Sequence, residues 1–382
     1  MREKIIIKYG ELWLKSEPVR MRFIKQLSDN IRRMLRDNGI KNFSLEKTRD
    51  MLVLETLETG SRKAQDVLKK VFGISWFARA RETEANMESI EKAALEAAKA
   101  IKPGESFAIR ASRSDKSFGC TSKDIEEKIG SKIKGKVNLS NPDFTIFAEV
   151  KKTKVYIYSE KIRGLGGMPF GVSGRVLSLI SGGIDSAVSS WMMMKRGCET
   201  DFVHFHPEIF TGNMKLEKVM GTVKMLREYS PCSLNLYVVP FSEIQKIIVE
   251  NCERRMTCVL CRRSMYRAAQ MLAGDTRSKA LVTGENLAQV ASQTLDNLYV
   301  ENGVLKMPIF RPLIGMDKEE TIRIAKKIGT YNISIGAGCC ALSPKKPSTK
   351  ARLNRVLAEE KKAKNLGKLI KSAVKNADKV II

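Results

Sequence analysis

Long apolar runs are missing from this chain of 382 residues. None approaches the ~18–20 residues that cross a membrane. The first stretch, MREKIIIKYGELWLKS, lacks the apolar core and the small-residue cleavage site of a secretory signal. We therefore expect a cytoplasmic protein with no membrane partner, in which most of the eight cysteines stay reduced. Reduced cysteines favour metal binding or catalysis over structural disulfides.

Acidic residues are scarce relative to basic ones. The chain has 42 Asp and Glu against 68 Lys and Arg, which gives a net charge of +26. The excess is spread along the chain, with +12 in residues 1–170 and +14 in the remainder. A merely solubilising surface usually mixes the two signs, whereas this balance is skewed. The composition therefore favours a polyanionic partner, above all a nucleic acid.

The length favours two or three domains. Residues 1–80 follow the order strand, helix, strand, strand, helix, strand, which resembles a small ferredoxin-like α+β domain. Residues 81–168 open with the helix MESIEKAALEAAKAI and end with two alternating strands. Five Gly and Pro positions between 164 and 171 then form a linker-like stretch, so we expect a domain boundary near residue 170.

Residues 172–382 alternate strands with helices. The expected strands are RVLSLI, TDFVHFH, NLYVVPF and ALVTGE, and the expected helices cover residues 187–196, 214–229, 242–256 and 287–298. Apolar strands alternating with helices predict an α/β domain with a doubly wound parallel sheet. The last segment, 341–382, has 12 basic and 3 acidic residues with helical apolar spacing. It predicts basic amphipathic helices that pack on the sheet or face RNA.

The segment SLISGGIDSAV places Ser181, Gly182, Gly183, Asp185 and Ser186 between a strand and a helix. Glycines let the backbone approach a ligand closely, and the N–H groups of such a turn favour an anion. The lysine of a Walker A loop is missing, which argues against γ-phosphoryl transfer. A tight turn would explain the glycines alone, but the whole SGGxDS pattern after an apolar strand predicts phosphate binding.

SGGIDS resembles the PP-loop of the ATP-pyrophosphatase superfamily. The resemblance implies ATP and Mg²⁺, with AMP transferred to a carbonyl or amide oxygen so that a poor leaving group becomes a good one. It also implies that Asp185 helps to organise Mg²⁺ and the phosphates, while Ser181 and Ser186 hydrogen-bond them. The N–H dipoles of the loop would stabilise charge on the departing pyrophosphate.

Three further segments look like those of the tRNA 4-thiouridine synthetases: CRRSMYRAA, TGENLAQVASQTLDN and CCALSPKKPSTKA. The segment FAIRASRSDKSFGCTSKDIEEKIGSKI is similar to a THUMP RNA-binding domain. The resemblance covers nearly the whole chain and implies a ferredoxin-like domain at 1–80, a THUMP domain at 81–168 and a PP-loop catalytic domain at 172–382. Carried over residue by residue, it assigns nucleotide contacts also to Leu179, Ile180, Gly182, Gly183, His204, Phe205, Arg262, Gly284 and Gln293.

Some of these residues have simpler interpretations when taken alone. His204 and His206 can merely share one face of an alternating strand. Arg262 can be a surface charge or an RNA contact. Gly284 can be a plain turn glycine, although a glycine after a buried strand also suits a close backbone approach.

The family resemblance implies that O4 of a tRNA uridine, position 8 in this family, is adenylated. A sulfur nucleophile then attacks C4 and AMP departs. The implied partners are tRNA and a sulfur donor, either sulfide or a persulfide-carrying protein, and the resemblance extends to a homodimer. The first two domains would hold the tRNA acceptor end by shape and phosphate contacts. Two other functions stay open: a thiolase acting at another base position, and a non-catalytic tRNA-binding protein.

Four cysteines are candidates for a role in sulfur delivery. Cys258 and Cys261 lie three apart in RRMTCVLCRR, so their thiols face one side of an expected helix, and Cys339 and Cys340 follow much later. Many bacterial relatives use a C-terminal rhodanese domain, for which the end at Ile382 leaves no room. Archaeal-type members with a similar arrangement hold an Fe–S cluster. The resemblance therefore implies Cys258, Cys261 and either Cys340 or Cys339 as cluster ligands, with the spacing in favour of Cys340.

Other chemistries for these thiols stay open. A CxxC disulfide relay could feed a catalytic persulfide on Cys340 or Cys339. A zinc site and unpaired core thiols are the remaining alternatives. In each reactive case we expect the flanking arginines to lower the thiol pKa values.

Overall fold

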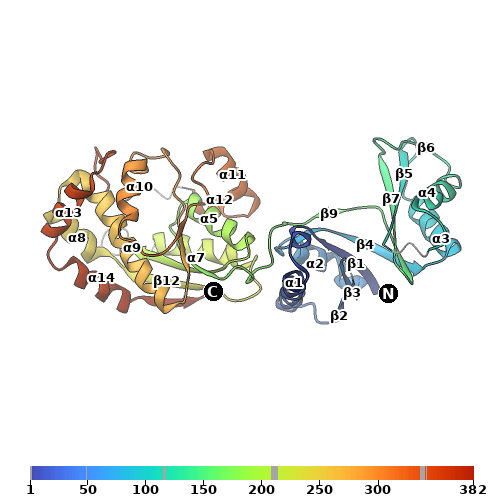
Figure 1. Ribbon diagram of the computed structural model, residues 1–382, viewed down its shortest axis with the longest axis horizontal. Helices are drawn as coiled ribbons and strands as arrows, with labels where there is room; N and C mark the ends of the chain where they lie inside the picture. Colours follow the sequence, from blue (N-terminus) through green and yellow to red (C-terminus); the bar gives the residue numbers. More distant parts are fainter. Residues whose placement is uncertain (1, 49, 115–117, 208–213, 336–339, 341) are drawn as a thin grey trace. The chain divides into compact units, whose positions relative to one another are not determined.

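The computed structural model describes residues 2–48, 50–114, 118–207, 214–335, 340 and 342–382. They form two compact units, Met1–Gly167 and Met168–Ile382, each with a sheet of its own (Figure 1). The first unit is α+β and the second is α/β, so the predicted fold class is confirmed. Within the described ranges, no helix combines the length and apolarity that a membrane span requires.

The first unit is built on one mixed sheet. Its strand order is β2-β3-β1-β4-β8-β7-β5-β6, with β9 paired to β4. The long strand β4 joins two halves, because its first part pairs with β1 and its last four residues pair with β8. The predicted boundary at residue 80 falls within this strand and stays a prediction. The elements are β1 (Arg2–Tyr9), η1 (Glu11–Leu14), α1 (Glu17–Asp37), β2 (Phe43–Lys47), β3 (Leu52–Leu57), α2 (Glu58–Leu68), β4 (Ile74–Glu84), α3 (Met87–Ala98), β5 (Ser106–Arg113), α4 (Ser122–Gly130), β6 (Lys136–Val137), β7 (Phe144–Val150), β8 (Lys154–Tyr158) and β9 (Ile162–Arg163).

A cluster of four charges ties the two halves of this sheet together. Lys8 on β1 contacts Asp50, 2.6 Å away, and also Glu149 on β7. Lys151 contacts the same two carboxylates at 2.7 and 2.6 Å. Since the Glu149 side chain is only 7% exposed, these pairs are poorly screened by water. The cluster therefore stabilises one orientation of the β1–β3 half against the β5–β8 half.

The second unit has the strand order β14-β13-β10-β11-β12-β15. The first five strands are parallel, and β15 pairs with β12 in the antiparallel direction. The elements are β10 (Arg175–Leu179), α5 (Ile184–Lys195), β11 (Glu199–His206), α7 (Met214–Arg227), β12 (Asn235–Pro240), α8 (Ser242–Asn251), η2 (Arg254–Met256), α9 (Thr257–Asp275), β13 (Ala280–Val282), α10 (Leu295–Asn302), β14 (Ile309–Phe310), α11 (Lys318–Lys327), α12 (Tyr331–Ser334), α13 (Leu353–Lys362), α14 (Leu366–Lys375) and β15 (Asp378–Ile381).

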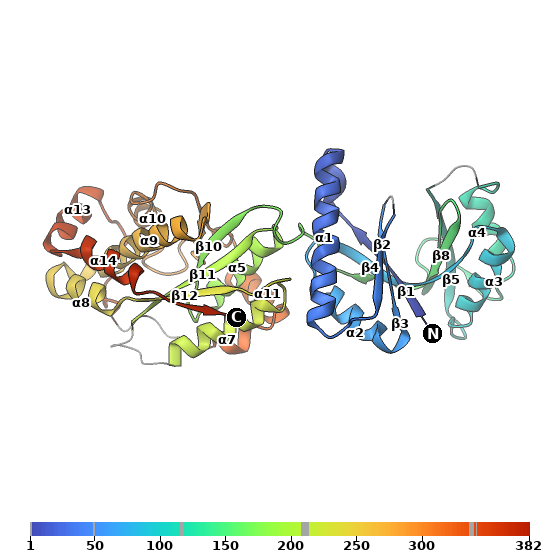
Figure 2. The same ribbon diagram turned by 90° about the horizontal axis from the view of Figure 1, so that it is seen from below.

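Helices cover both faces of this sheet, as the doubly wound prediction requires (Figure 2). Leu177 of β10 belongs to the core beneath α8, α9 and α14. Its neighbour Val176 packs on the opposite face, in a smaller cluster with Met193 of α5. Adjacent residues of one strand thus enter two different cores, which explains the consecutive apolar residues Val176 and Leu177 of β10.

The C-terminal part of the second unit differs from expectation at two points. The predicted helix 242–256 ends early, because Cys252 is extended (φ −113°, ψ 162°) and the N–H of Glu253 donates to the Glu359 carboxylate at 2.8 Å. Strand β15 was not predicted, since its four residues follow a helix without any turn signal. The basic helices α13 and α14 are present and pack on α8 and α9.

Candidate active site

The SGGIDS loop lies where the strand order of the second unit reverses. β10 is flanked by β11 on one side and by β13 on the other, and the connections from these strands lead to opposite faces of the sheet. In open α/β sheets a crevice forms at the carboxyl ends of strands at such a switch point. The loop after β10 and the Thr283–Glu285 segment after β13 therefore meet at one edge.

A cavity of about 250 Å³ occupies this edge. Eight of the residues predicted to bind the nucleotide line it: Leu179, Ser181, Gly183, Asp185, Ser186, Arg262, Gly284 and Gln293. Ile180, Gly182, His204 and Phe205 are not among its lining residues. The cavity wall also contains four residues that the sequence did not single out, namely Met265, Tyr266, Thr283 and Glu285.

Serine hydroxyls hold the loop in shape. The backbone N–H of Ser181 donates to the hydroxyl of Ser186 at 3.1 Å, and that of Gly183 donates to the hydroxyl of Ser181 at 3.2 Å. Helix α5 starts at the next residue, with Gly183 as its N-cap and no side-chain cap. The first N–H groups of a helix have no partner within the helix, so the open end of α5 suits an anion.

Gly284 allows β13 to approach this loop. A Cβ atom built on it would lie 2.6 Å from both the carbonyl carbon of Asp185 and the nitrogen of Ser186. No side chain fits at that distance from backbone. The glycine is therefore required by contact between the two segments, which distinguishes it from an ordinary turn glycine.

Asp185 is bridged to two other segments. Its Oδ1 atom lies 2.7 Å from Nζ of Lys318, at the start of α11, and its Oδ2 accepts from Nε2 of Gln289 at 3.0 Å. Neither partner was predicted, and no local motif marks them, because both reach the loop only through the tertiary fold. The carboxylate is thus oriented by one cation and one amide.

A buried charge cluster lies beside the cavity. The Glu285 carboxylate accepts from Arg262 at 2.9 Å and from the Tyr266 hydroxyl at 2.7 Å. Its second oxygen accepts from Thr283 at 3.0 Å and from Arg311 at 2.5 Å. Burial opposes ionisation of Glu285, but Arg262 and Arg311 prevail and hold its pKa below the ordinary value. Glu285 therefore anchors Arg262 as an ion pair.

Glu301 of α10 faces the same arginine with the opposite result. Its side chain is 0% exposed, and one oxygen lies 3.5 Å from Arg262. Burial raises the pKa of Glu301 to about 8, although Arg262 opposes the shift. At neutral pH the cluster then has two arginines and one ionised carboxylate. The unbalanced positive charge suits a phosphate in the adjoining cavity.

The histidines of β11 are buried beside the loop. Nδ1 of His204 lies 3.0 Å from the carbonyl oxygen of Ile180, and the rings of His204 and His206 are 5.8 Å apart. Phe205 packs against Phe241 in the core on the other face. His204 and Ile180 thus support the strand ends next to the cavity, while Phe205 serves the core.

The cysteines lie near Arg262 but outside the cavity lining. Cys261 is buried, Cys258 is half-buried, and both occur in the first turns of α9. Cys340 is exposed and close enough to act on the pKa of both thiols, while Cys339 lies outside the described residues. In the part of the chain that is described, no three His, Cys, Asp or Glu side chains stand in a metal-binding arrangement.

Arg262 lowers the pKa of Cys258 as expected, but this effect is outweighed by burial. Burial raises the pKa of both Cys258 and Cys261, and the influence of Arg262 on Cys258 is too small to reverse it. Arg263 is turned away, since it pairs with Glu360 at 2.7 Å and is only 2% exposed. Unligated, these thiols are protonated, so metal binding would have to release their protons.

The predicted helix 287–298 is also wrong. Leu287 and Val290 are 44% and 45% exposed. Ala288 has φ of 62°, which breaks a helix, and its N–H donates to the carbonyl of Gln293 at 2.8 Å. The helix α10 begins only at Leu295, where Thr294 caps it. The resulting loop brings Gln289 and Gln293 to the cavity edge.

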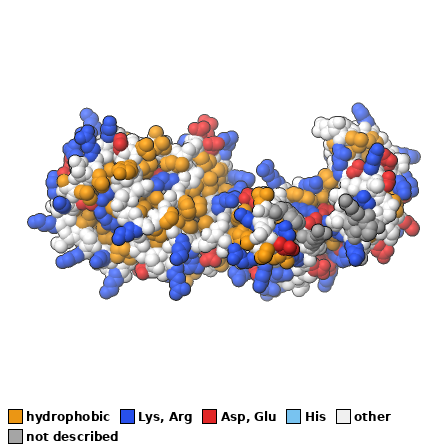
Figure 3. All heavy atoms as spheres, viewed as in Figure 1, with side chains coloured by type: hydrophobic (Ala, Val, Ile, Leu, Met, Phe, Trp, Pro, Cys, Tyr) orange, Lys and Arg blue, Asp and Glu red, His pale blue; other side chains and the backbone are white. Residues whose placement is uncertain are grey.

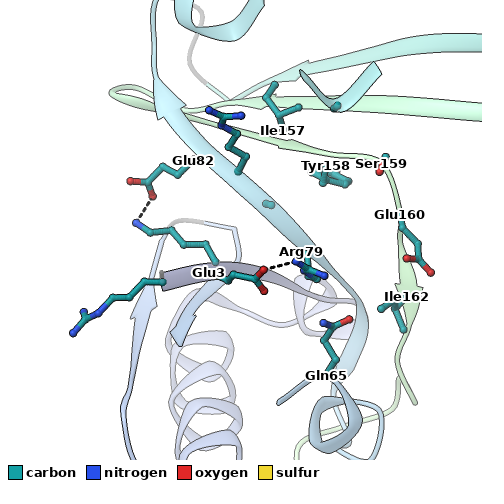
Figure 4. Close-up of a pocket in the computed structure, with 14 residues that line it drawn as sticks. Glu3, Gln65, Arg79, Glu82, Ile157, Tyr158, Ser159, Glu160 and Ile162 are labelled. Carbon is teal, nitrogen blue, oxygen red and sulfur yellow. Dashed lines mark hydrogen bonds and ion pairs between the residues drawn. The ribbon is translucent and has the colours of Figure 1, made fainter. Parts of the chain in front are cut away.

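The first unit has a larger cavity of about 750 Å³, along β4 (Figure 4). Arg79 pairs with Glu3 on its wall, and Lys4 pairs with Glu82 at 2.7 Å. Because these basic groups already have carboxylate partners, the cavity has little of the unbalanced charge seen beside the SGGIDS loop. This cavity therefore suits a phosphate group less well than the cavity beside the SGGIDS loop does.

The architecture defines a class of protein: a PP-loop α/β domain joined to ferredoxin-like and THUMP domains. The family model described as thiamine biosynthesis protein (ThiI) matches residues 171–365. The models of the ThiI ferredoxin-like domain and the THUMP domain match residues 4–78 and 84–160. The chain belongs to the tRNA sulfurtransferase (ThiI) family.

Known proteins resemble the chain over nearly its whole length. A probable tRNA sulfurtransferase of Caldanaerobacter subterraneus subsp. tengcongensis is 42% identical over 371 residues, covering 95% of this chain and 96% of the relative. The crystal structure of a 4-thiouridine synthetase–RNA complex with bound ATP matches with a TM-score of 0.90 and 31% identity, covering 100% of both chains. A Pyrococcus horikoshii protein of known structure, PH1313, matches at 27% identity and a TM-score of 0.67, covering 86% of this chain and 99% of that one.

Proposed function

We propose that this protein is an ATP-dependent tRNA sulfurtransferase that adenylates O4 of uridine 8 and replaces this oxygen with sulfur to give 4-thiouridine. The observation that carries the proposal is the cavity at the switch point, where SGGIDS, Arg262 and Gly284 converge. The ATP-bound neighbour, similar over its full length, supports ATP as the nucleotide.

The residues of the cavity would have different roles in adenylation. The N-terminus of α5 and the loop N–H groups would bind pyrophosphate, and Arg262 would stabilise the charge that develops as it leaves. Asp185 offers hard carboxylate oxygens in a fixed orientation and would hold Mg²⁺ against the phosphates. Lys318, which now pairs with Asp185, would then face the same phosphates.

Sulfur delivery is assigned to the cysteines near Arg262. Cys258 and Cys261 share the first turns of α9, and Cys340 is close enough to raise the pKa of both thiols, so the three soft sulfur atoms lie in one neighbourhood. This donor set suits an Fe–S cluster, with Cys340 or Cys339 as the third ligand. Such a cluster, when bound, supplies an iron that accepts sulfide. The protein's own residues contribute the thiolates and Arg262, whose charge offsets the anionic ligands.

RNA recognition is assigned to the first unit. Its THUMP-matched segment, 84–160, and its ferredoxin-like half would hold tRNA by shape and phosphate contacts, as proteins treat double-stranded RNA. The charge cluster of Lys8, Asp50, Glu149 and Lys151 keeps the two halves in one orientation, so that they act as a single platform. The RNA complex of the full-length structural neighbour supports tRNA as the partner, and assembly as a homodimer is part of the proposal.

The proposed reaction is tested by nucleoside analysis of tRNA incubated with the protein, ATP, Mg²⁺ and sulfide under anaerobic conditions. We expect 4-thiouridine at position 8 and release of AMP and pyrophosphate. Asp185→Ala should abolish both while leaving tRNA affinity within a few-fold of the unchanged protein. A thiolated base elsewhere would favour the alternative thiolase, and unchanged activity in the variant would leave only tRNA binding.

The cluster is tested without reference to activity. Protein purified without oxygen should contain stoichiometric iron and acid-labile sulfide and a visible absorption band, all lost in Cys258→Ala. Cys232→Ala, at an exposed cysteine, is the matched control and should keep them. Thiolation by protein without iron or acid-labile sulfide would instead favour a persulfide on Cys340 or Cys339.

A further inference from the structure

Helices α13 and α14 present five exposed lysines that the proposed chemistry does not use. Lys368, Lys371 and Lys375 of α14 recur at spacings of three and four residues, which places them on one side of the helix, and Lys364 lies two residues before the helix begins. Lys361 is exposed in the last turn of α13. These five residues are called the α13–α14 surface. In Figure 3, Lys and Arg side chains gather along this edge of the second unit.

The acidic residues of the same segment are already engaged. Glu359 pairs with Lys362 at 2.7 Å and also accepts from the N–H of Glu253 at 2.8 Å. Glu360 is held by Arg263 at 2.7 Å and by Arg267 at 2.8 Å. Among the described residues, no carboxylate pairs with any lysine of the α13–α14 surface. Its positive charge is therefore available to a partner.

The surface is concave where the two helices meet. A notch of about 450 Å³ is lined by Arg267, Lys361, Lys364 and Lys368, with Glu360 as its only acidic lining residue. Because Glu360 is neutralised by two arginines, the notch is strongly cationic. Its size and charge suit a phosphate group, and the lysines along α14 would continue the contact at intervals of ~5–6 Å.

The burial of the apolar side of α14 distinguishes between a membrane and a nucleic acid as the anionic partner. A basic amphipathic helix binds a membrane by inserting its apolar face. Here the apolar face of α14, with Leu366, Ile370 and Ala373, is already buried against α8 and α9. Leu369 and Val374 of α14 are partly buried against the same core, and Leu353 and Leu357 of α13 are exposed, each at 41%. The lysines of α14 thus belong to a helix whose apolar face is packed inside the protein. This arrangement favours binding to a nucleic acid backbone over binding to a membrane.

We propose that the α13–α14 surface binds the phosphodiester backbone of the RNA substrate, as a second RNA contact outside the THUMP-matched segment. The proposal rests on the proposed function and extends it. The surface belongs to the same compact unit as the PP-loop cavity. RNA held there is therefore held directly by the catalytic domain.

The test is the salt dependence of tRNA binding to the full-length protein. K364Q/K368Q/K371Q removes three charges from the surface, and K224Q/K279Q/K327Q removes three from scattered exposed positions of the same unit. Each lost phosphate contact lowers the slope of log Kd against log salt by ~0.7–0.9. We expect the slope of log Kd against log salt to be lower by about two in the surface variant than in the unchanged protein. The surface variant should also bind tRNA roughly tenfold more weakly at 0.15 M salt. The scattered variant should stay close to the unchanged protein.

Steady-state kinetics supply the second readout. In the surface variant KM for tRNA should rise, while KM for ATP and kcat at saturating tRNA remain unchanged. Equal slopes and affinities in both variants would overturn the proposal, as would a loss confined to binding of phosphatidylserine vesicles. If the unchanged protein neither binds nor thiolates tRNA, the proposed function itself is wrong. The proposal that this surface binds RNA would then fail as well, because it rests on that function.

Discussion

Gly284 and Asp185 touch through their backbones at the floor of the PP-loop cavity. A Cβ on Gly284 would lie 2.6 Å from the carbonyl carbon of Asp185, nearer than any side-chain carbon can approach. The contact joins the end of β13 to the start of α5 across the switch point of the sheet. The position of the loop is therefore set by the absence of one side chain on the neighbouring strand.

Gly284→Ala should displace the loop. The overlap is with backbone and cannot be relieved by a rotamer change, so we expect a loss of ~1–3 kcal/mol in the free energy of unfolding. KM for ATP should rise about tenfold or more, since the loop N–H groups move off the phosphates. Gly315→Ala is the matched control, because a Cβ there meets nothing within 4 Å. Identical behaviour of the two variants would mean that the loop adapts freely.

Lys318→Gln should impair adenylation more than nucleotide binding. The change removes the cation 2.7 Å from Asp185 and leaves that carboxylate with Gln289 alone. If Lys318 turns to the phosphates during the reaction, kcat should fall by ~10²–10³, the effect typical of losing one electrostatic contact to the transition state. Single-turnover AMP formation with saturating ATP measures it, and Lys327→Gln, on the exposed side of the same helix, controls for charge. A purely higher KM would assign Lys318 to binding only.

Glu285→Gln should release Arg262 from its anchor. The carboxylate accepts from Arg262, Tyr266, Thr283 and Arg311, and a neutral amide cannot balance two arginines. We expect a higher KM for ATP and a lower thermal midpoint. Tyr266→Phe removes only the neutral hydroxyl and should do less of both. Equal effects would show that geometry, rather than charge, makes Glu285 matter.

Sequence alone could predict those parts of the site that are continuous in the chain. SGGIDS carries its own glycines, serines and aspartate, and the strand before it is apolar enough to be recognised. Gly284 and Arg262 came from family resemblance, and the structure places them at the same cavity. The prediction of ligands among Cys258, Cys261, Cys339 and Cys340 stays a prediction.

The parts that could not be predicted depend on tertiary contacts. Lys318 and Gln289 meet Asp185 from more than a hundred residues away, and nothing in their local sequence marks them. The helix predicted over 287–298 is wrong before Leu295, since Ala288 has a positive φ and Leu287 and Val290 are exposed instead of packing on the core. The opposite protonation of Glu285 and Glu301 arises from burial and arginine distance, which no local pattern encodes.

Glu301→Gln should change how stability depends on pH. Burial raises the pKa of Glu301 to about 8, from an ordinary value of 4.5. Between these values the folded protein keeps a proton that the unfolded chain has released, so the free energy of unfolding falls as pH rises. Glutamine cannot ionise and should remove this part of the decline. Urea unfolding at pH 5, 6, 7 and 8 measures the effect. The free energy of unfolding of the variant, relative to that of the unchanged protein, should increase towards pH 8.

The control for this titration is Glu319→Gln, which alters an exposed carboxylate on α11. It should leave the pH dependence of unfolding as it is. A second consequence concerns ATP: above pH 8 the ionised Glu301 would balance Arg262, so KM for ATP should rise in the unchanged protein and stay flat in Glu301→Gln. If the free energy of unfolding depends on pH in the same way in all three proteins, Glu301 does not carry the extra proton of the folded state. The unbalanced positive charge beside the cavity would then not come from a protonated Glu301.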